Sequence, residues 1–122
     1  MSGVLLWAAV AVTGGCGALL RLLVDEAIRS RTGGSCPVGI LVVNVSGSLL
    51  LGILAGAALP YDIALIAATA FVGAYTTFAT WMLDIVNATV ERLIAIAIGN
   101  LILSVSFGLL AAAIGRSVGM QL

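Results

Sequence analysis

Four apolar segments follow one another along the 122-residue chain, and short polar stretches separate them. They cover about residues 3–24, 36–58, 63–90 and 93–114. A helix needs roughly 20 consecutive apolar residues to cross the hydrocarbon core of a bilayer. The pattern therefore predicts an all-α membrane protein with four transmembrane helices, formed by residues 1–122 as a single domain.

Polar residues and turn formers set the expected helix ends. Pro37 fits the first turn of the second helix, and Asp62 has a side chain suited to the N-cap of the third. The other expected boundaries are a polar connection starting at Asp25 and Glu26, a loop at Gly33 and Gly34, a turn at Glu91 and Arg92, and a helix end at Arg116.

The third segment is longer than one simple span, and we expect it to be broken near its middle, between Gly73 and Thr76. A flexible glycine there precedes Thr76 and Thr77, whose hydroxyls compete for backbone hydrogen bonds. In hydrocarbon, freed backbone groups are tolerated only where protein, water or an ion satisfies them. Two interpretations remain open: a buried ion site at mid-membrane, or a kink at which small residues let another helix approach.

Two further polar residues lie within apolar segments, and each has two interpretations. Asn44 is either an interhelical hydrogen-bonding residue or a donor lining a pore, because an uncompensated amide is costly at that depth. Arg21 is either an arginine that extends to the membrane interface or a cation that attracts an anion into a vestibule.

The third and fourth segments each carry a row of polar side chains. Thr77, Thr80 and Asp84 are spaced so as to share one helical face, beside an aromatic pair formed by Phe78 and Trp81. In the fourth segment Asn100 and Ser104 are one turn apart. The edges of aromatic rings carry partial positive charge that can face a small anion. The two rows therefore predict a polar track across the membrane.

Composition limits the classes of function that the chain can have. Hydrophobic residues make up 62% of the chain and charged residues 8%, which is typical of an integral membrane protein. The chain contains no histidine, no nucleophile–base pair, no phosphate-binding loop and no basic tract. We therefore expect neither an enzyme nor a nucleic-acid-binding protein.

Three motifs in order resemble those of the Fluc (CrcB-type) fluoride channels. Residues 14–21, GGCGALLR, resemble the family's GGxxGAxxR. Residues 37–48, PVGILVVNVSGS, resemble PxGTLxVNxxGS, and residues 71–81, FVGAYTTFATW, resemble FCGGxTTFSTF. The resemblance covers nearly the whole chain.

The resemblance implies a passive fluoride-selective channel in a bacterial-type inner membrane, which exports cytoplasmic fluoride and lowers its toxicity. Such channels are antiparallel, dual-topology dimers with two pores lined by both subunits. The backbone carbonyls of Gly73 and Thr76 would hold a structural sodium ion on the dimer axis. Contacts with fluoride along the pore are expected from Phe78, Trp81, Asn44, Thr77, Thr80, Ser104, Asn100 and Arg21.

The chain departs from the family's pattern at four positions, which are Trp81, Ala79, Ala74 and Asp84. Trp81 replaces a phenylalanine of the pore, and it is bulkier and adds an N–H donor. One of the two pores is therefore a candidate for altered or lost conduction. On the sequence alone, the substitution Trp81→Phe is expected to preserve or raise flux.

Two alternative functions compete with the channel. A small multidrug-type proton-coupled antiporter also has four spans, but it needs an embedded carboxylate, usually in its first span. Residues 3–20 contain no acid, and Asp84 is the one candidate. The second alternative is a non-conducting partner subunit of a heterodimeric fluoride channel.

The arginines predict an orientation, because the Lys/Arg content of short loops determines it and acids contribute little. The first and third connections share one side of the membrane and carry Arg29, Arg31 and Arg92, with Arg21 nearby. The opposite side carries Arg116 alone. We expect both termini to lie outside. The second, antiparallel subunit is then a paralogue, whereas a chain inserting both ways would pair with itself.

A reporter placed at the C-terminus checks this orientation. When the chain is expressed alone, the reporter should be labelled mainly from the outer side. Labelling in comparable amounts from both sides would contradict the fixed orientation and favour the homodimer.

Overall fold

The computed structural model describes residues 2–33 and 38–122, and all regular structure in these ranges is helical. The elements are α1 (Gly3–Thr32), α2 (Val38–Gly56), α3 (Tyr61–Ala64), the π-helix η1 (Leu65–Val72), α4 (Gly73–Tyr75), α5 (Ala79–Val90) and α6 (Ile94–Gly119). Within the described ranges, four helical stretches are long and apolar enough to cross a membrane: α1, α2, residues 61–90 and α6. The expectation of an all-helical chain with four spans is confirmed.

The first helix is longer than the sequence pattern predicts. The expected polar connection at Asp25 is wrong, because α1 continues through that residue to Thr32. Arg29 Nη2 lies 2.8 Å from Asp25 Oδ2, an ion pair one turn apart that supports the added turns. The helix stops at Gly33, whose φ of 74° is the left-handed conformation typical of a helix C-terminus.

The other helix ends differ by smaller amounts. Asp62 is not the N-cap of the third span. That place is taken by Pro60, and Asp62 lies in the first turn of α3, where its charge favours the helix dipole. Arg116 does not end the last helix, which continues to Gly119. The expected start of the second span at Cys36 and Pro37 lies outside the described residues.

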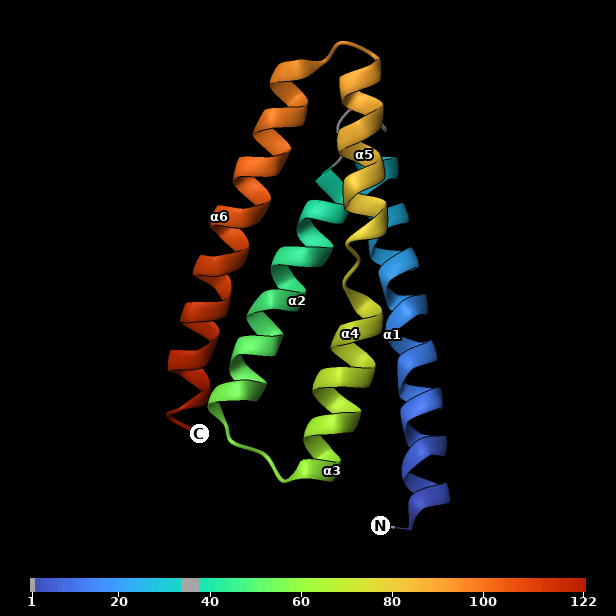
Figure 1. Ribbon diagram of the computed structural model, residues 1–122, viewed down its shortest axis with the longest axis vertical. Helices are drawn as coiled ribbons and strands as arrows, with labels where there is room; N and C mark the ends of the chain where they lie inside the picture. The colour runs from blue at the N-terminus through green and yellow to red at the C-terminus, as the bar shows by residue number, and fades with distance from the viewer. Residues whose placement is uncertain (1, 34–37) are drawn as a thin grey trace.

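The helices run alternately up and down (Figure 1). The two chain termini and the α2–α3 connection lie at one end of the molecule, and the α5–α6 turn lies at the other. This is the arrangement that four consecutive spans require.

Glycines bring α2 and α6 close together along their length. A Cβ atom on Gly52 of α2 would collide with the carbonyl oxygen of Ala112, and one on Gly115 of α6 with that of Leu49. Small residues that let helix backbones approach closely are typical of packing inside membranes. Gly56, Gly119 and, against η1, Gly17 make contacts of the same kind.

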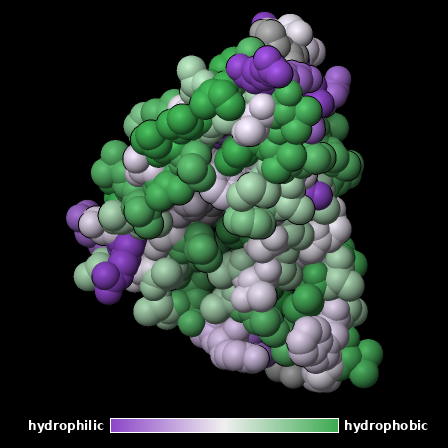
Figure 2. Space-filling view, turned by 45° about the horizontal axis from the view of Figure 1, so that its top comes forward, coloured by the Kyte–Doolittle hydropathy of each residue, from purple (hydrophilic) through white to green (hydrophobic). Residues whose placement is uncertain are grey.

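The outer surface of the helices is apolar. Most of the long apolar side chains of α1 and α6 are exposed. In Figure 2, hydrophobic residues cover most of the visible face, and hydrophilic residues gather at its top and left edge. Such a surface is stable only in lipid or against another protein, so the chain is a multi-pass membrane protein.

The close approach of α2 and α6 gives a testable prediction. Gly115→Ala should lower stability by about 1–3 kcal/mol, because the new methyl group has no space beside Leu49. Gly99→Ala in the same helix is the matched control. A Cβ there meets nothing within 4 Å, and alanine favours the helix by up to about 1 kcal/mol. Thermal unfolding of the two purified variants in detergent measures these changes in stability. Equal changes in melting temperature for Gly115→Ala and Gly99→Ala would contradict the close packing of α2 and α6.

Candidate functional site

The third span leaves helical geometry at Thr76. Helix α4 ends at Tyr75, Thr76 has extended backbone angles (φ −80°, ψ 159°), and α5 begins at Ala79. Gly73, at which the sequence places the start of the break, is helical, with φ −60° and ψ −38°. The π-helix η1 comes just before this point, and π-helical turns are frequent at functional sites.

Asn44 of α2 binds both backbone groups of Thr77. Its Nδ2 donates to the carbonyl oxygen of Thr77 at 2.9 Å, and the Thr77 N–H donates to its Oδ1, also at 2.9 Å. In a continuous helix the N–H would instead have bonded to Gly73. The amide therefore replaces the helical hydrogen bonds that the chain gives up. The interhelical bond proposed for Asn44 is present in the structure.

The loss of helical hydrogen bonds at the interruption also leaves carbonyl oxygens without donors. Within the described part of the chain, no hydrogen bond reaches the carbonyl oxygen of Gly73 or of Thr76. The N–H and the hydroxyl of Thr76 both donate to the carbonyl oxygen of Val72, at 3.0 and 3.1 Å. Two backbone acceptors thus remain available to a ligand at this level.

Arg21 of α1 reaches the same region. Its Nη1 donates to the carbonyl oxygen of Ala74 at 3.3 Å. The guanidinium group therefore lies beside the interruption rather than at the end of its own helix. A cation next to the last carbonyls of a helix interacts favourably with their partial negative charge.

The aromatic pair follows the interruption directly. The rings of Phe78 and Trp81 meet edge to face, with centroids 5.6 Å apart and an interplanar angle of 68°. Phe78 is 69% exposed. The indole N–H of Trp81 donates to Oδ1 of Asn100 on α6 at 3.3 Å.

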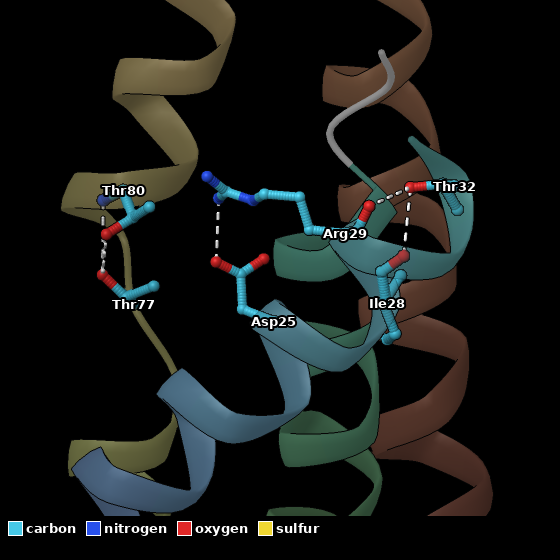
Figure 3. A network of polar contacts seen from close by, with 6 residues as sticks. All are labelled: Asp25, Ile28, Arg29, Thr32, Thr77 and Thr80. Atoms are coloured by element: carbon cyan, nitrogen blue, oxygen red, sulfur yellow. Dashed lines mark hydrogen bonds and ion pairs between the residues drawn. The ribbon is translucent and has the colours of Figure 1, made fainter. Parts of the chain in front are cut away.

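Hydroxyl and amide groups surround these rings. The hydroxyl of Thr77 lies 3.4 Å from that of Thr80 and accepts the Thr80 N–H at 3.3 Å, so it caps the start of α5 (Figure 3). On α6, Ser104 donates to Asn100 Oδ1 at 2.8 Å. The residues expected to form the polar track are thus connected in two groups, one at the interruption and one on α6.

Two neighbouring grooves lie beside these groups, and Thr77 and Ser104 border them, whereas Thr80 and Asn100 border neither. One, of about 480 Å³, is lined by residues of α2, η1, α4, the interruption and α5. The other, of about 320 Å³, lies along α6 and includes Ser104 and Gly108 in its lining. Asn44, Ser48 and Trp81 border both grooves. The arrangement offers a small solute a path with polar groups on an apolar wall.

Asp84 belongs to a charged group apart from the grooves. The sequence pattern places it with Thr77 and Thr80, but it borders neither groove. The charged groups near it are Arg29 and Asp25 of α1. Figure 3 shows Asp25 and Arg29 extending from α1 on the side that faces the turn of Thr77 and Thr80.

Two polar contacts in and near the site were not predicted from the sequence. Ser48 borders both grooves and donates to the backbone oxygen of Asn44 at 2.8 Å. Its place one turn after Asn44 on the same helical face was a usable signal. The second is the pair of Ser46 and Tyr75, whose hydroxyls lie 2.9 Å apart. No local spacing predicts this contact, because the residues lie on different helices.

The substitution Asn44→Ala tests the amide that holds the interruption. It leaves the N–H and C=O of Thr77 without partners in apolar surroundings, at a cost of about 1–3 kcal/mol for each group. We expect lower thermal stability in detergent and faster hydrogen exchange at the Thr77 amide. Ser48→Ala, one turn away, is the control and should leave that exchange rate unchanged. Unchanged exchange in Asn44→Ala would show that other groups hold the loop.

Comparisons with known proteins identify the family of the chain. A family model described as CrcB-like protein, Camphor Resistance (CrcB), matches residues 8–116. The Mycobacterium tuberculosis H37Rv protein "Fluoride-specific ion channel FluC 2" is 48% identical over 113 residues, which are 93% of this chain and 90% of the relative. "Fluoride-specific ion channel FluC 2" of Mycolicibacterium paratuberculosis is 48% identical over 97% of both chains. "Fluoride-specific ion channel FluC 1" of Symbiobacterium thermophilum is 40% identical, over 93% of this chain and 96% of its own. The chain therefore belongs to the CrcB, or FluC, family, which is a family of membrane ion channels and not of enzymes.

Proposed function

We propose that this chain is one subunit of a passive, fluoride-selective channel that lets cytoplasmic fluoride leave down its gradient. Hydrogen fluoride crosses lipid uncharged and ionises in a neutral cytoplasm, so a pore for the anion lowers its toxicity. The observation that carries the proposal is the interruption at 76–78, which Asn44 holds and which ends at the exposed ring of Phe78. Relatives that are 40–48% identical and named as fluoride-specific channels support the choice of ion.

The channel is a dimer in this proposal, because the chain supplies only one wall of a pore. Phe78 borders the larger groove, yet it is 69% exposed. A dehydrated ion has to be surrounded, so a second subunit would cover this side. Gly73 is also exposed, and a Cβ there would meet nothing within 4 Å. A second backbone could therefore approach closely. The antiparallel arrangement with two pores follows from the family resemblance.

A structural sodium ion fits the freed backbone. Carbonyl oxygens at interrupted helices are known ligands of sodium at membrane depth. The carbonyls of Gly73 and Thr76 have no hydrogen-bond donor in the described part of the chain. One pair from each subunit would hold the ion. When bound, sodium supplies the positive charge that stabilises these oxygens in a membrane interior.

The fluoride path would follow the two grooves. Ion selectivity requires that groups of the protein replace the hydration shell. The hydroxyls of Thr77 and Ser104 and the ring edges of Phe78 and Trp81 border these grooves and are suited to a small anion. Thr80 would act from behind Thr77, whose hydroxyl lies 3.4 Å from its own. Asn44 borders the place where the grooves meet. Arg21 would raise the local concentration of anions near the interruption.

A proton-coupled antiporter has less support. Such a carrier needs an acid in its transport path, and no acid of the described residues borders either groove. A dependence of transport on a proton gradient would revive it. The second alternative is a non-conducting partner subunit of a heterodimeric fluoride channel, and one measurement separates it from the proposed channel. Flux is then present only when the partner is co-expressed.

Fluoride efflux from liposomes tests the function. The purified protein, or its complex with the natural partner, should pass fluoride far faster than chloride. Equal chloride flux would contradict selectivity, and no flux with either preparation would reject the channel.

Phe78→Ile is the variant that connects this flux to the site. An aliphatic side chain has no polarised ring edge, so flux should be abolished or strongly reduced while the dimer stays intact. Phe107→Ile on α6 is the matched control, because Phe107 is also exposed but borders neither groove. Normal conduction by Phe78→Ile would show that the ring edge is not needed.

A further inference from the structure

The two grooves share three lining residues, which form the boundary between them. Asn44 and Ser48, one turn apart on α2, and Trp81 on α5 border both grooves. The α2 side of the boundary is fixed, because both ends of the Asn44 amide are bonded to Thr77, and Ser48 donates to the backbone oxygen of Asn44 at 2.8 Å. The side chain of Trp81 is therefore the part of the boundary that can change position.

Trp81 places the largest side chain of either groove lining at this boundary. Its side chain is half-buried, and its ring meets that of Phe78 edge to face. An ion that moves from the larger groove, of about 480 Å³, to the smaller one, of about 320 Å³, has to pass the indole. Side chains occupy discrete rotamers, so the rotamer of Trp81 determines how easily the boundary is crossed.

One hydrogen bond holds the indole in its observed orientation. The indole N–H donates to Oδ1 of Asn100 on α6 at 3.3 Å. An indole N–H can donate but cannot accept, so the oxygen of the amide must face it. Ser104 donates to the same oxygen at 2.8 Å, which helps to keep the amide in place. The bond joins α5 to α6 and opposes rotation of the ring about its side-chain bonds.

Asn100 acts on the indole from outside the grooves. It is 8% exposed, and it borders neither groove. A side chain in this place can affect an ion in the grooves through the ring that it holds. Asn100 is therefore a positioning residue for Trp81 and not a group that lines the path.

We propose that Trp81 is a barrier between the two grooves, and that its hydrogen bond to Asn100 latches the ring in the position that restricts passage. This inference rests on the proposed channel function and adds a step that limits the rate of fluoride movement. A neutral hydrogen bond shifts the populations of two side-chain positions by roughly 2- to 10-fold. Loss of the latch is therefore large enough to measure as a change in flux. The barrier also gives a physical reason for the expectation that Trp81→Phe preserves or raises flux.

Fluoride efflux from liposomes tests the barrier. Trp81→Phe removes both the bulk and the donor, so efflux should become several-fold faster. Asn100→Leu keeps the indole and removes its acceptor, so efflux should also become faster, to a smaller extent. Added to Trp81→Phe, Asn100→Leu should change nothing further, because no N–H remains to be held. Unchanged or slower efflux in Trp81→Phe would overturn the barrier. Slower efflux in the double variant than in Trp81→Phe would show that Asn100 acts on the ion itself, which contradicts its role as a latch.

The mobility of the indole is measured without any flux. The chain has two tryptophans, so Trp7→Phe leaves Trp81 as the one indole fluorophore. In this background, Asn100→Leu should add a fast component to the decay of fluorescence anisotropy in the purified protein. Phe107→Ile is the control, because Phe107 also lies on α6 but borders neither groove, and it should leave the decay unchanged. An unchanged decay in Asn100→Leu would show that the hydrogen bond does not hold the ring.

The barrier and the channel function fail in different ways. If neither the wild-type protein nor Trp81→Phe passes fluoride, alone or with the natural partner, the channel function itself is wrong. If the wild-type protein conducts and Trp81→Phe is no faster, only the barrier is wrong. Trp81→Phe decides this even if Asn100→Leu does not assemble, because it leaves the amide on α6 intact.

Discussion

The pair of hydrogen bonds between Asn44 and Thr77 is the interaction on which the interior of this protein depends. A helix that stops inside a membrane exposes N–H and C=O groups where no solvent can bind them. Asn44 is a neutral side chain that carries a donor and an acceptor at the spacing of a backbone amide, and it serves both groups of Thr77 at 2.9 Å. With these groups satisfied, the chain can pass through an extended residue and restart as α5. The exposed place of Phe78 and the free carbonyls of Gly73 and Thr76 both follow from that restart.

Close helix packing is the second requirement. Asn44 reaches Thr77 because α2 lies against the third span. Gly47 takes part in this contact, since a Cβ there would collide with the side chain of Thr76. Gly52 and Gly115 hold α2 against α6 in the same manner. Van der Waals contact has to replace the hydrophobic effect as the force between helices in lipid, and small residues maximise that contact. The polar site and the glycine-rich packing are thus parts of one arrangement.

The all-helical class and the number of spans could be predicted from the sequence, because the length of an apolar segment needed to cross a bilayer does not depend on tertiary contacts. Helix ends were predicted less well. Asp25 looked like the start of a loop, but α1 continues through it, and Asp25 pairs with Arg29 one turn later. Gly73 looked like the break, but flexibility permits a helix as readily as a turn, and the partner on α2 decides where the helix stops. For Asn44 the sequence left two interpretations, since its partner lies 33 residues away. The bond from Trp81 to Asn100 joins two helices and has no local signal at all.

The length of α1 has a consequence for how the protein sits in a bilayer. Its 30 residues give a helix about 45 Å long, whereas the hydrocarbon core is about 30 Å thick. The excess corresponds to the polar final turns that carry Asp25, Arg29 and Arg31, which favour the headgroup region over the acyl chains. The two arginines there can bind anionic headgroups, while Arg21 joins the same helix to Ala74 deeper in the protein. The hydrogen bond of Arg21 is thus a direct contact between the helix that extends beyond the hydrocarbon core and the carbonyls beside the interruption.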